Sequence, residues 1–209
     1  MLQIHEANWV AWWQDGVEKA TDSFDIDGTY DFDNSPGLET LRQAKRDGLC
    51  RHIGITGNRA QHMCHVLRNV SVDTFLLAFS YDPIIRYAEI DGFDLAAERR
   101  VTLILGAIFH GGRFTAVHPE WLDEPPPWMT PQLRERFARL YEIQKESGMS
   151  LVQLAVRFVL MKEEPSVILI GAASPDEIEE SVNAVHEGPL PRDLHEEVRA
   201  IGVTQAGEE

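Results

Sequence analysis

The part of the sequence best suited to binding a ligand is 167–182. The apolar run Val167–Ile170 predicts a fully buried strand, and Gly171–Ala173 predicts a tight turn. Ser174 is a favourable N-cap, a proline follows it at the first helical position, and Glu177 completes a capping box. A buried strand that leads into a capped helix presents free N–H groups and a positive dipole end at the edge of a sheet. The stretch therefore predicts an anion site suited to a nucleotide phosphate, although any α/β protein contains such junctions.

Two other groups of residues could bind metal ions. His62, Cys64 and His65 lie on a predicted helix at i, i+2 and i+3, so Cys64 points away from the two histidines. Zinc needs four converging ligands, and no fourth one follows. The acidic segment 22–33 has its glycine too early for a calcium loop that starts at Asp25. We expect no metal site, and we expect the acidic segment to be a solvated loop.

Composition limits the possible functions. The 209 residues, 44% hydrophobic and 25% charged, predict one soluble globular domain over 1–209. The net charge of −15 argues against nucleic acid as a partner, but it permits one nucleotide in a locally positive pocket. Cys50 and Cys64 are too few for a disulfide framework. Without a signal peptide or a membrane-spanning run, we expect a cytoplasmic protein that has no membrane contact.

The three tryptophans of 7–20 indicate a helix or a lid that packs aromatic rings, and one of these rings could stack on a sugar. The segment 110–129 is predicted to be a long loop.

Hydrophobic periodicity predicts alternating strands and helices. Expected strands are 2–5, 52–57, 74–79, 101–108 and 167–170; expected helices are 35–48, 59–69, a short one around 95, 130–148, 150–161, one from 174 and 191–201. Apolar strands separated by helices imply a parallel sheet covered on both faces. On counting alone, five strands favour a doubly wound sheet over an eight-stranded barrel.

Several stretches resemble the aldo-keto reductase family. They are Gly37-Leu-Glu-Thr-Leu-Arg-Gln-Ala-Lys-Arg-Asp-Gly48, Arg51-His-Ile-Gly-Ile-Thr-Gly57, Leu105-Gly-Ala-Ile-Phe-His-Gly-Gly112, 125–158 and 168–182. The sugar-oxidising branch, with the aldose, fucose and galactose dehydrogenases, is the most similar, and the match covers about 2–186. The resemblance implies strands four to eight of a (β/α)₈ TIM barrel with outer helices, in an N-terminally truncated chain. This expectation replaces the one from counting.

The same resemblance places His5 at the family's active-site histidine, at the end of strand four. Its imidazole would hydrogen-bond the substrate oxygen during hydride transfer. A histidine at a strand end is otherwise more often structural. The family's proton-donor tyrosine, and its aspartate and lysine, lie before strand four and have no counterpart here. We therefore expect activity lowered by about 10²- to 10⁴-fold.

The cofactor side of the family site has counterparts in this sequence. By the resemblance, Thr56, Gly57 and Asn58 would hold the carboxamide, and Tyr81 and Phe109 would lie near the nicotinamide ring. Gly111, Gly112 and Arg113 would bind the pyrophosphate. Gly171, Ala172 and Ala173 would contact the adenosine ribose or its phosphate, and Glu180 would hold the adenine amine. Glu177 replaces the basic residue of NADP-preferring members, so the resemblance favours NAD slightly over NADP. The alternative reading, that Glu177 only completes the capping box, is equally good.

Two hypotheses follow. In the first, the chain is an NAD(P)-dependent oxidoreductase that transfers hydride between nicotinamide and a sugar or a small aldehyde or alcohol. In the second, it is a catalytically silent nucleotide-binding or interaction module. That module would form a homodimer to cover the open edges of its sheet.

Overall fold

A computed structural model describes residues 1–204 of the protein. These residues divide into two compact units. The first comprises Met1–Ser80, Ala88–Gly106 and Glu164–Ile168, and the second comprises Tyr81–Tyr87, Ala107–Glu163 and the part that follows from Leu169.

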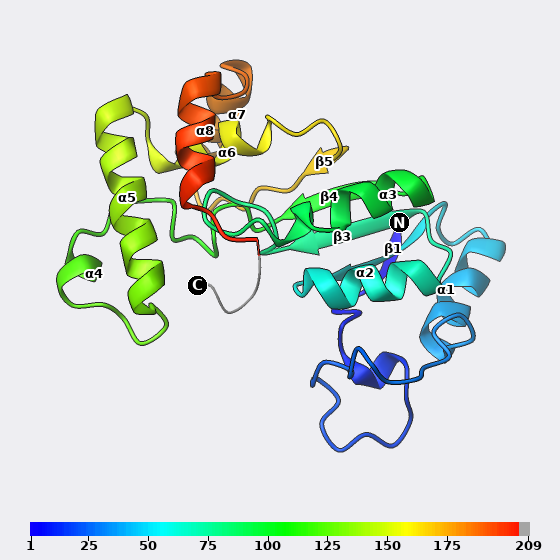
Figure 1. Ribbon diagram of the computed structural model, residues 1–209. Coiled ribbons are helices and arrows are strands. Elements are labelled where there is room, and N and C mark those ends of the chain that lie inside the picture. Colours follow the sequence, from blue (N-terminus) through cyan, green and yellow to red (C-terminus); the bar gives the residue numbers. More distant parts are fainter. Residues whose placement is uncertain (205–209) are drawn as a thin grey trace. The chain divides into compact units, whose positions relative to one another are not determined.

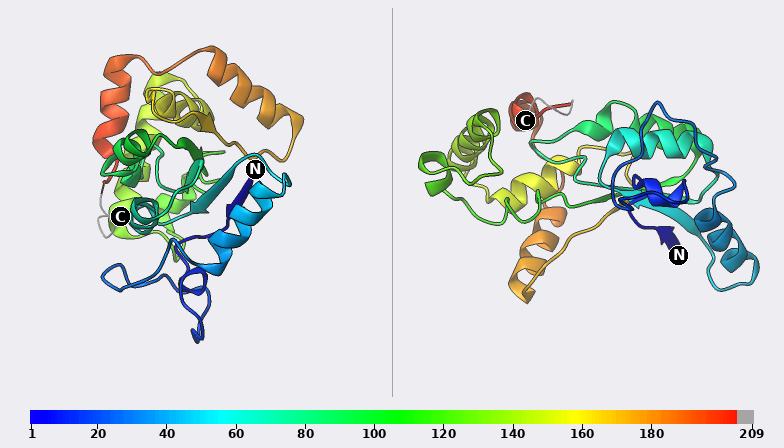
Figure 2. Two further views of the ribbon diagram at one scale, coloured as in Figure 1. Left: turned by 90° about the vertical axis from the view of Figure 1, so that its right-hand side faces the viewer. Right: turned by 90° about the horizontal axis from the view of Figure 1, so that it is seen from below.

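A five-stranded parallel sheet forms the centre of the first unit (Figures 1 and 2). Its strands are β1 (Leu2–Ile4), β2 (Ile53–Gly57), β3 (Thr74–Ala78), β4 (Thr102–Gly106) and β5 (Val167–Ile168). Each strand pairs with the next one along the chain, and the spatial order is β1-β2-β3-β4-β5. The five strands that the sequence predicts are thus present, with slightly different ends.

The strand order corrects the expectation from counting alone. A doubly wound sheet reverses its strand order at a switch point, and this sheet has no reversal. Successive right-handed crossovers that never reverse place all the connecting helices on one face, as in a (β/α)₈ barrel.

Three helices of the first unit connect strands of this sheet. They are α1 (Pro36–Arg46), α2 (Ala60–Asn69) and α3 (Gly92–Arg99). The α1 helix begins where the sequence predicts, because the Ser35 hydroxyl accepts a hydrogen bond from the Leu38 N–H at 3.3 Å. In Figure 1, α2 and α3 lie along β3 and β4. Ile55, Phe75 and Leu77 are fully buried in the core of the unit.

The segment between β1 and α1 is almost entirely irregular and extends away from the sheet (Figures 1 and 2). Of the helix or lid predicted over 7–20, the helical part is only a single 3₁₀ turn, η1 (Val10–Trp12). Aromatic packing holds the segment in place, because Trp13 and Phe24 are buried and both contact the ring of Phe32.

The last strand differs from the prediction of a fully buried run over Val167–Ile170. β5 contains only two residues, and Val167 is 41% exposed. Among the described residues it pairs with β4 alone, so one side of the strand has no neighbour to bury it. An apolar run in the sequence cannot show whether a strand is central or at an edge.

The second unit is mainly helical. Its helices are α4 (Glu120–Asp123), α5 (Pro131–Ser147), α6 (Leu151–Val159), α7 (Pro175–His186) and α8 (Arg192–Ile201). The short α4 lies inside the predicted loop 110–129. The predicted capping box at Ser150 and Gln153 is present with both reciprocal hydrogen bonds. In the two sets of views α5 lies beside α8, and α6 packs against α7 (Figures 1 and 2).

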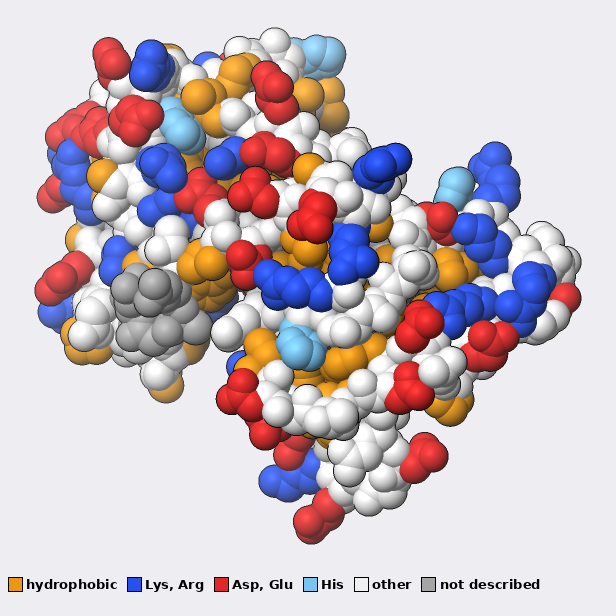
Figure 3. Space-filling view, turned by 45° about the vertical axis from the view of Figure 1, so that its right-hand side comes forward, with side chains coloured by type: hydrophobic (Ala, Val, Ile, Leu, Met, Phe, Trp, Pro, Cys, Tyr) orange, Lys and Arg blue, Asp and Glu red, His pale blue; other side chains and the backbone are white. Residues whose placement is uncertain are grey.

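Several charged residues form ion pairs at the surface of the first unit. On α1, Arg42 pairs with Asp33, Lys45 with Asp73 at 2.6 Å, and Arg46 with Glu39. Figure 3 likewise shows basic and acidic side chains close together on the face that it presents.

Within residues 1–204, no helix has both the length and the apolar character that crossing a bilayer requires.

Candidate functional site

His5 lies at the carboxyl end of β1, as the sequence predicts. It is exposed, and its ring meets the Trp9 indole edge-on at 6.1 Å between centroids. Because Ile4 pairs with Ile55 in the parallel register, β2 ends at the same edge of the sheet. The Ala7 N–H extends the pairing by donating to the Thr56 carbonyl at 2.8 Å. The geometry therefore places His5 and the end of β2, with Asn58 after it, at one edge of the first unit.

The backbone of the turn after β1 is held by hydrogen bonds on four consecutive carbonyls. Two of the donors are indole N–H groups from tryptophans of the irregular segment. The pairs are His5 O with Trp12 Nε1 at 2.9 Å, Glu6 O with Trp9 N at 2.8 Å, Ala7 O with Trp13 Nε1 at 2.7 Å and Asn8 O with Phe24 N at 3.1 Å. The tryptophans thus fix the turn that carries His5, a role that the sequence only partly indicated as core packing.

Residues 56–58, which are the last two residues of β2 and the residue after it, have three different environments. Thr56 is half-buried, Gly57 is buried and Asn58 is exposed. A Cβ atom at Gly57 would lie 2.4 Å from the Met63 sulfur and 2.6 Å from the Asn8 side-chain oxygen. Glycine is therefore required at position 57 because two buried side chains approach its backbone. This close approach occurs in the first unit beside the strand end that carries His5.

In the second unit, the segment from Phe109 to Arg113 forms a tight loop. His110, Gly111 and Gly112 all have left-handed backbone angles, with φ of 52°, 65° and 87°. A Cβ atom at Gly112 would have nothing within 4 Å, so its backbone is open to an approaching group. The Arg113 guanidinium donates to the His110 carbonyl at 2.9 Å and lies 4.1 Å from the centre of the Trp128 ring. Phe109 is buried.

A buried pair that the sequence did not reveal supports this loop. His110 Nδ1 lies 2.9 Å from a carboxylate oxygen of Asp82, whose side chain is 1% exposed. The other oxygen of Asp82 accepts from the backbone N–H groups of Ile84 and Ile85. The two partners are 28 residues apart, and no motif of either one points to the other. The pair fixes the loop, which explains how His110 sustains a left-handed backbone.

Tyr81 is less accessible than its predicted place beside the nicotinamide suggests. It is 1% exposed, and its ring stacks on Phe158 at 5.5 Å. In this structure the ring is part of the core of the second unit. Its contact with a cofactor stays a prediction.

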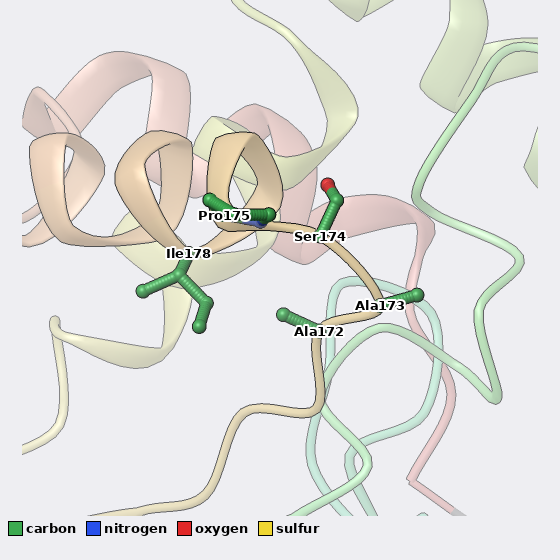
Figure 4. Close-up of a pocket in the computed structure, with 5 residues that line it drawn as sticks. All are labelled: Ala172, Ala173, Ser174, Pro175 and Ile178. Atoms are coloured by element: carbon green, nitrogen blue, oxygen red, sulfur yellow. The ribbon is translucent and has the colours of Figure 1, made fainter.

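The turn before α7 forms a shallow apolar hollow of about 430 Å³, lined by Ala172, Ala173, Ser174, Pro175 and Ile178. Ala172 and Ile178 point to one side of the turn, whereas Ala173 and Ser174 point to the other (Figure 4). Gly171 is exposed, and a Cβ atom there would meet nothing within 4 Å. The hollow has the apolar side walls and open backbone that a flat ring or a ribose can lie against.

The cap of α7 is close to the predicted one but not identical. The Ser174 hydroxyl accepts from the Glu177 N–H at 3.3 Å, as expected. The Glu177 carboxylate, however, accepts from the Ala173 N–H at 2.7 Å, one residue before the N-cap. The capping box is therefore incomplete, because the extended turn presents an earlier N–H to the carboxylate. One donor that an anion could use is already occupied by a negative charge.

Glu180 has a partner on another helix. One of its carboxylate oxygens accepts a hydrogen bond from the Ser150 hydroxyl at 2.6 Å, and Ser150 is the N-cap of α6. This bond links α7 to α6. The predicted contact with an adenine amine stays a prediction, and it would have to share the carboxylate with Ser150.

The residues considered for zinc have separate environments in the first unit. His62 Nε2 is 3.0 Å from the Phe24 carbonyl, and burial lowers the pKa of this histidine. Burial raises the pKa of the Cys64 thiol to about 12. The His65 ring contacts Phe24 and Phe32. In the part of the chain that the structure describes, no group of three potential metal ligands converges.

These features define an α/β protein in which polar residues gather where parallel strands end. The chain belongs to the aldo/keto reductase family, whose model matches residues 11–203. It is 26% identical over 172 residues to pyridoxal 4-dehydrogenase of Microbacterium luteolum. This alignment covers 80% of this chain and 48% of the relative. It is also 26% identical over 164 residues to L-galactose dehydrogenase of Arabidopsis thaliana, covering 77% of this chain and 50% of the relative.

Solved structures show a similar fold. The aldo-keto reductase AKR11C1 from Bacillus halodurans, in its apo form, matches with a TM-score of 0.63 at 20% identity, over 82% of this chain and 59% of that one. Its holo form gives a TM-score of 0.62 over 80% and 53%. The chain thus spans about half the length of the curated relatives that it matches.

Proposed function

We propose that the chain is the portion of an aldo-keto reductase barrel that contains strands four to eight, as a single family domain over 1–209. The unreversed parallel order of β1 to β5 supports this proposal, as does the fold of the solved relatives. Its cytoplasmic location stays a prediction.

The proposed activity is NAD(P)-dependent hydride transfer between nicotinamide and a sugar or a small aldehyde or alcohol. The observation that carries the proposal is the exposed His5, on a turn whose four carbonyls are all hydrogen-bonded, at the edge where β1 and β2 both end. A fixed imidazole can hydrogen-bond a substrate oxygen with little reorganisation. A bound nicotinamide would supply the hydride acceptor or donor.

The chain also contains residues that fit such a dinucleotide. Gly112 offers open backbone in a tight loop that also contains Gly111, and Arg113 adds a positive charge that is already held in place. The hollow at Ala172 and Ala173 suits the adenosine part. We propose that Glu177 disfavours a 2′-phosphate, because its carboxylate takes the Ala173 N–H and would repel a second anion.

Fluorescence titration of the purified chain with NADH and NADPH tests this proposal. We expect NADH to bind more tightly than NADPH, Arg113→Gln to weaken both, and Glu177→Gln to improve NADPH relative to NADH. Arg192→Gln, at an exposed position of α8, is the matched control. Absence of binding of either nucleotide at millimolar concentration would refute the proposal.

The alternative is a catalytically silent nucleotide-binding or interaction module that dimerises. The exposed sheet edges favour it, because Leu2 on β1 and Val167 on β5 are 42% and 41% exposed, and each strand has one partner among the described residues. Unpaired edges invite pairing with another chain. A dimer in sedimentation equilibrium that binds NADH but turns over no aldehyde or sugar would favour this alternative.

A further inference from the structure

Two side chains next to His5 carry buried oxygen atoms without a hydrogen-bond donor. Asn8 is 2% exposed, and within residues 1–204 its Oδ1 has no partner. The Oε2 atom of Glu6 is likewise buried and unpartnered in the described structure. Glu6 also has a left-handed backbone, with φ of 53°. Buried acceptors are nearly always paired, so two such atoms within three residues require an explanation.

The surrounding backbone shows that these atoms are not a by-product of a loose turn. Every carbonyl from His5 to Asn8 is hydrogen-bonded, and two indole N–H groups are used to achieve this. The Asn8 oxygen packs closely on Gly57, where a Cβ atom would lie 2.6 Å from it. The fold therefore satisfies the backbone carbonyls of the turn and leaves the two buried side-chain acceptors without a donor among the described residues. Such strain and unmet bonding are typical of sites that are completed by a ligand.

We infer that Glu6 and Asn8 form an acceptor pair for the hydroxyl groups of a polyhydroxylated, sugar-like substrate, beside the oxygen that His5 receives. This inference rests on the proposed function of His5. Both open atoms are oxygens that only accept, so their ligand has to bring hydrogen-bond donors. A sugar brings several hydroxyl donors, whereas a simple aldehyde brings none. The acceptor pair thus selects one of the substrate classes that the family assignment leaves open.

The two residues differ in how a ligand reaches them. Glu6 is half-buried as a residue, so part of its side chain reaches the surface, whereas its unpartnered Oε2 atom is buried. Asn8 is enclosed, so its donor has to be small, either a single hydroxyl or a water that bridges to one. Glu6 is therefore the main contact, and its charge makes its hydrogen bonds the stronger ones.

The test is ligand-observed NMR titration of the 209-residue chain with L-galactose and with benzaldehyde, which has no hydroxyl group. We expect Glu6→Gln to weaken L-galactose binding at least tenfold and to change benzaldehyde binding less than twofold. Asn8→Ala should weaken L-galactose binding in the same direction. Glu18→Gln, an exposed carboxylate of the same segment, is the matched control and should change neither. Thermal melts of each variant establish that it is folded.

Three results would overturn the inference. One is a folded Glu6→Gln chain that binds L-galactose as tightly as the wild type. Another is an equal loss for L-galactose and benzaldehyde, and the third is a wild-type chain that binds no L-galactose. NADH titration of the same samples separates the two proposals. Retained NADH binding without sugar dependence on Glu6 refutes only the acceptor pair, whereas Glu6-dependent sugar binding without NADH binding refutes only the oxidoreductase.

Discussion

Gly57→Ala is the most direct perturbation of the edge that carries the proposed site. The added Cβ atom would lie 2.4 Å from the Met63 sulfur and 2.6 Å from the Asn8 oxygen, both closer than the 3.0 Å below which real Cβ contacts essentially never occur. Met63 is fully buried and Asn8 nearly so, and neither can turn outward into solvent. The protein therefore has to shift backbone or core side chains to accommodate one methyl group.

Overpacking of this kind costs about 1–3 kcal/mol. For a chain of this size, each kcal/mol lowers Tm by about 2–4 °C, so we expect a loss of about 2–12 °C. Urea denaturation and a thermal melt, both followed by far-UV circular dichroism, measure the effect.

The matched control is Gly171→Ala. This glycine has no positive φ, and its added Cβ atom would meet nothing within 4 Å. We expect its stability to stay within about 0.5 kcal/mol of the wild type. If Gly57→Ala is as stable as Gly171→Ala, the close approach of Asn8 and Met63 to β2 is refuted, and the acceptor pair loses its geometric basis.

Three further predictions concern single groups. Burial lowers the pKa of His62, so the folded state binds fewer protons than the unfolded state. Stability should therefore fall as the pH drops below about 6.5. His62→Phe should reduce this pH dependence, which urea denaturation at pH 7.5 and at pH 5.5 measures. Burial raises the pKa of Cys64 to about 12, so in a Cys50→Ser background the folded chain should resist iodoacetamide at pH 8, and alkylation at the rate of a free thiol would contradict this. Ser174→Ala removes the hydroxyl that accepts from the Glu177 N–H and should cost about 1 kcal/mol in urea denaturation; an unchanged midpoint would show that the cap contributes nothing.

Local rules predicted the helix starts well because the required groups are near in sequence. Ser35, Thr130 and Ser150 each accept a hydrogen bond from an N–H three residues on, and Gly148 ends α5 with φ of 70°. The same rules were wrong in detail at Glu177, whose carboxylate accepts a hydrogen bond from the Ala173 N–H instead of the Ser174 N–H. The choice between two neighbouring N–H groups depends on the path of the turn, which the residue types do not fix.

Long-range relations were harder to foresee. The pairing of Asp82 with His110 joins two loops 28 residues apart, and the burial of Tyr81 depends on Phe158. Likewise, the two-residue β5 depends on having one neighbour, although its sequence is as apolar as that of a central strand.

The sequence alone determined where the strands and most helices lie, that His5 follows the first strand, and which family the motifs resemble. Periodicity, capping residues and short motifs act over a few residues, so the chain order contains them directly. Only the tertiary structure decided the indole hydrogen bonds that hold the turn after β1, the pairing of Asp82 with His110, and the buried acceptors of Glu6 and Asn8. These features depend on which distant segments meet, and that is settled when the whole unit packs.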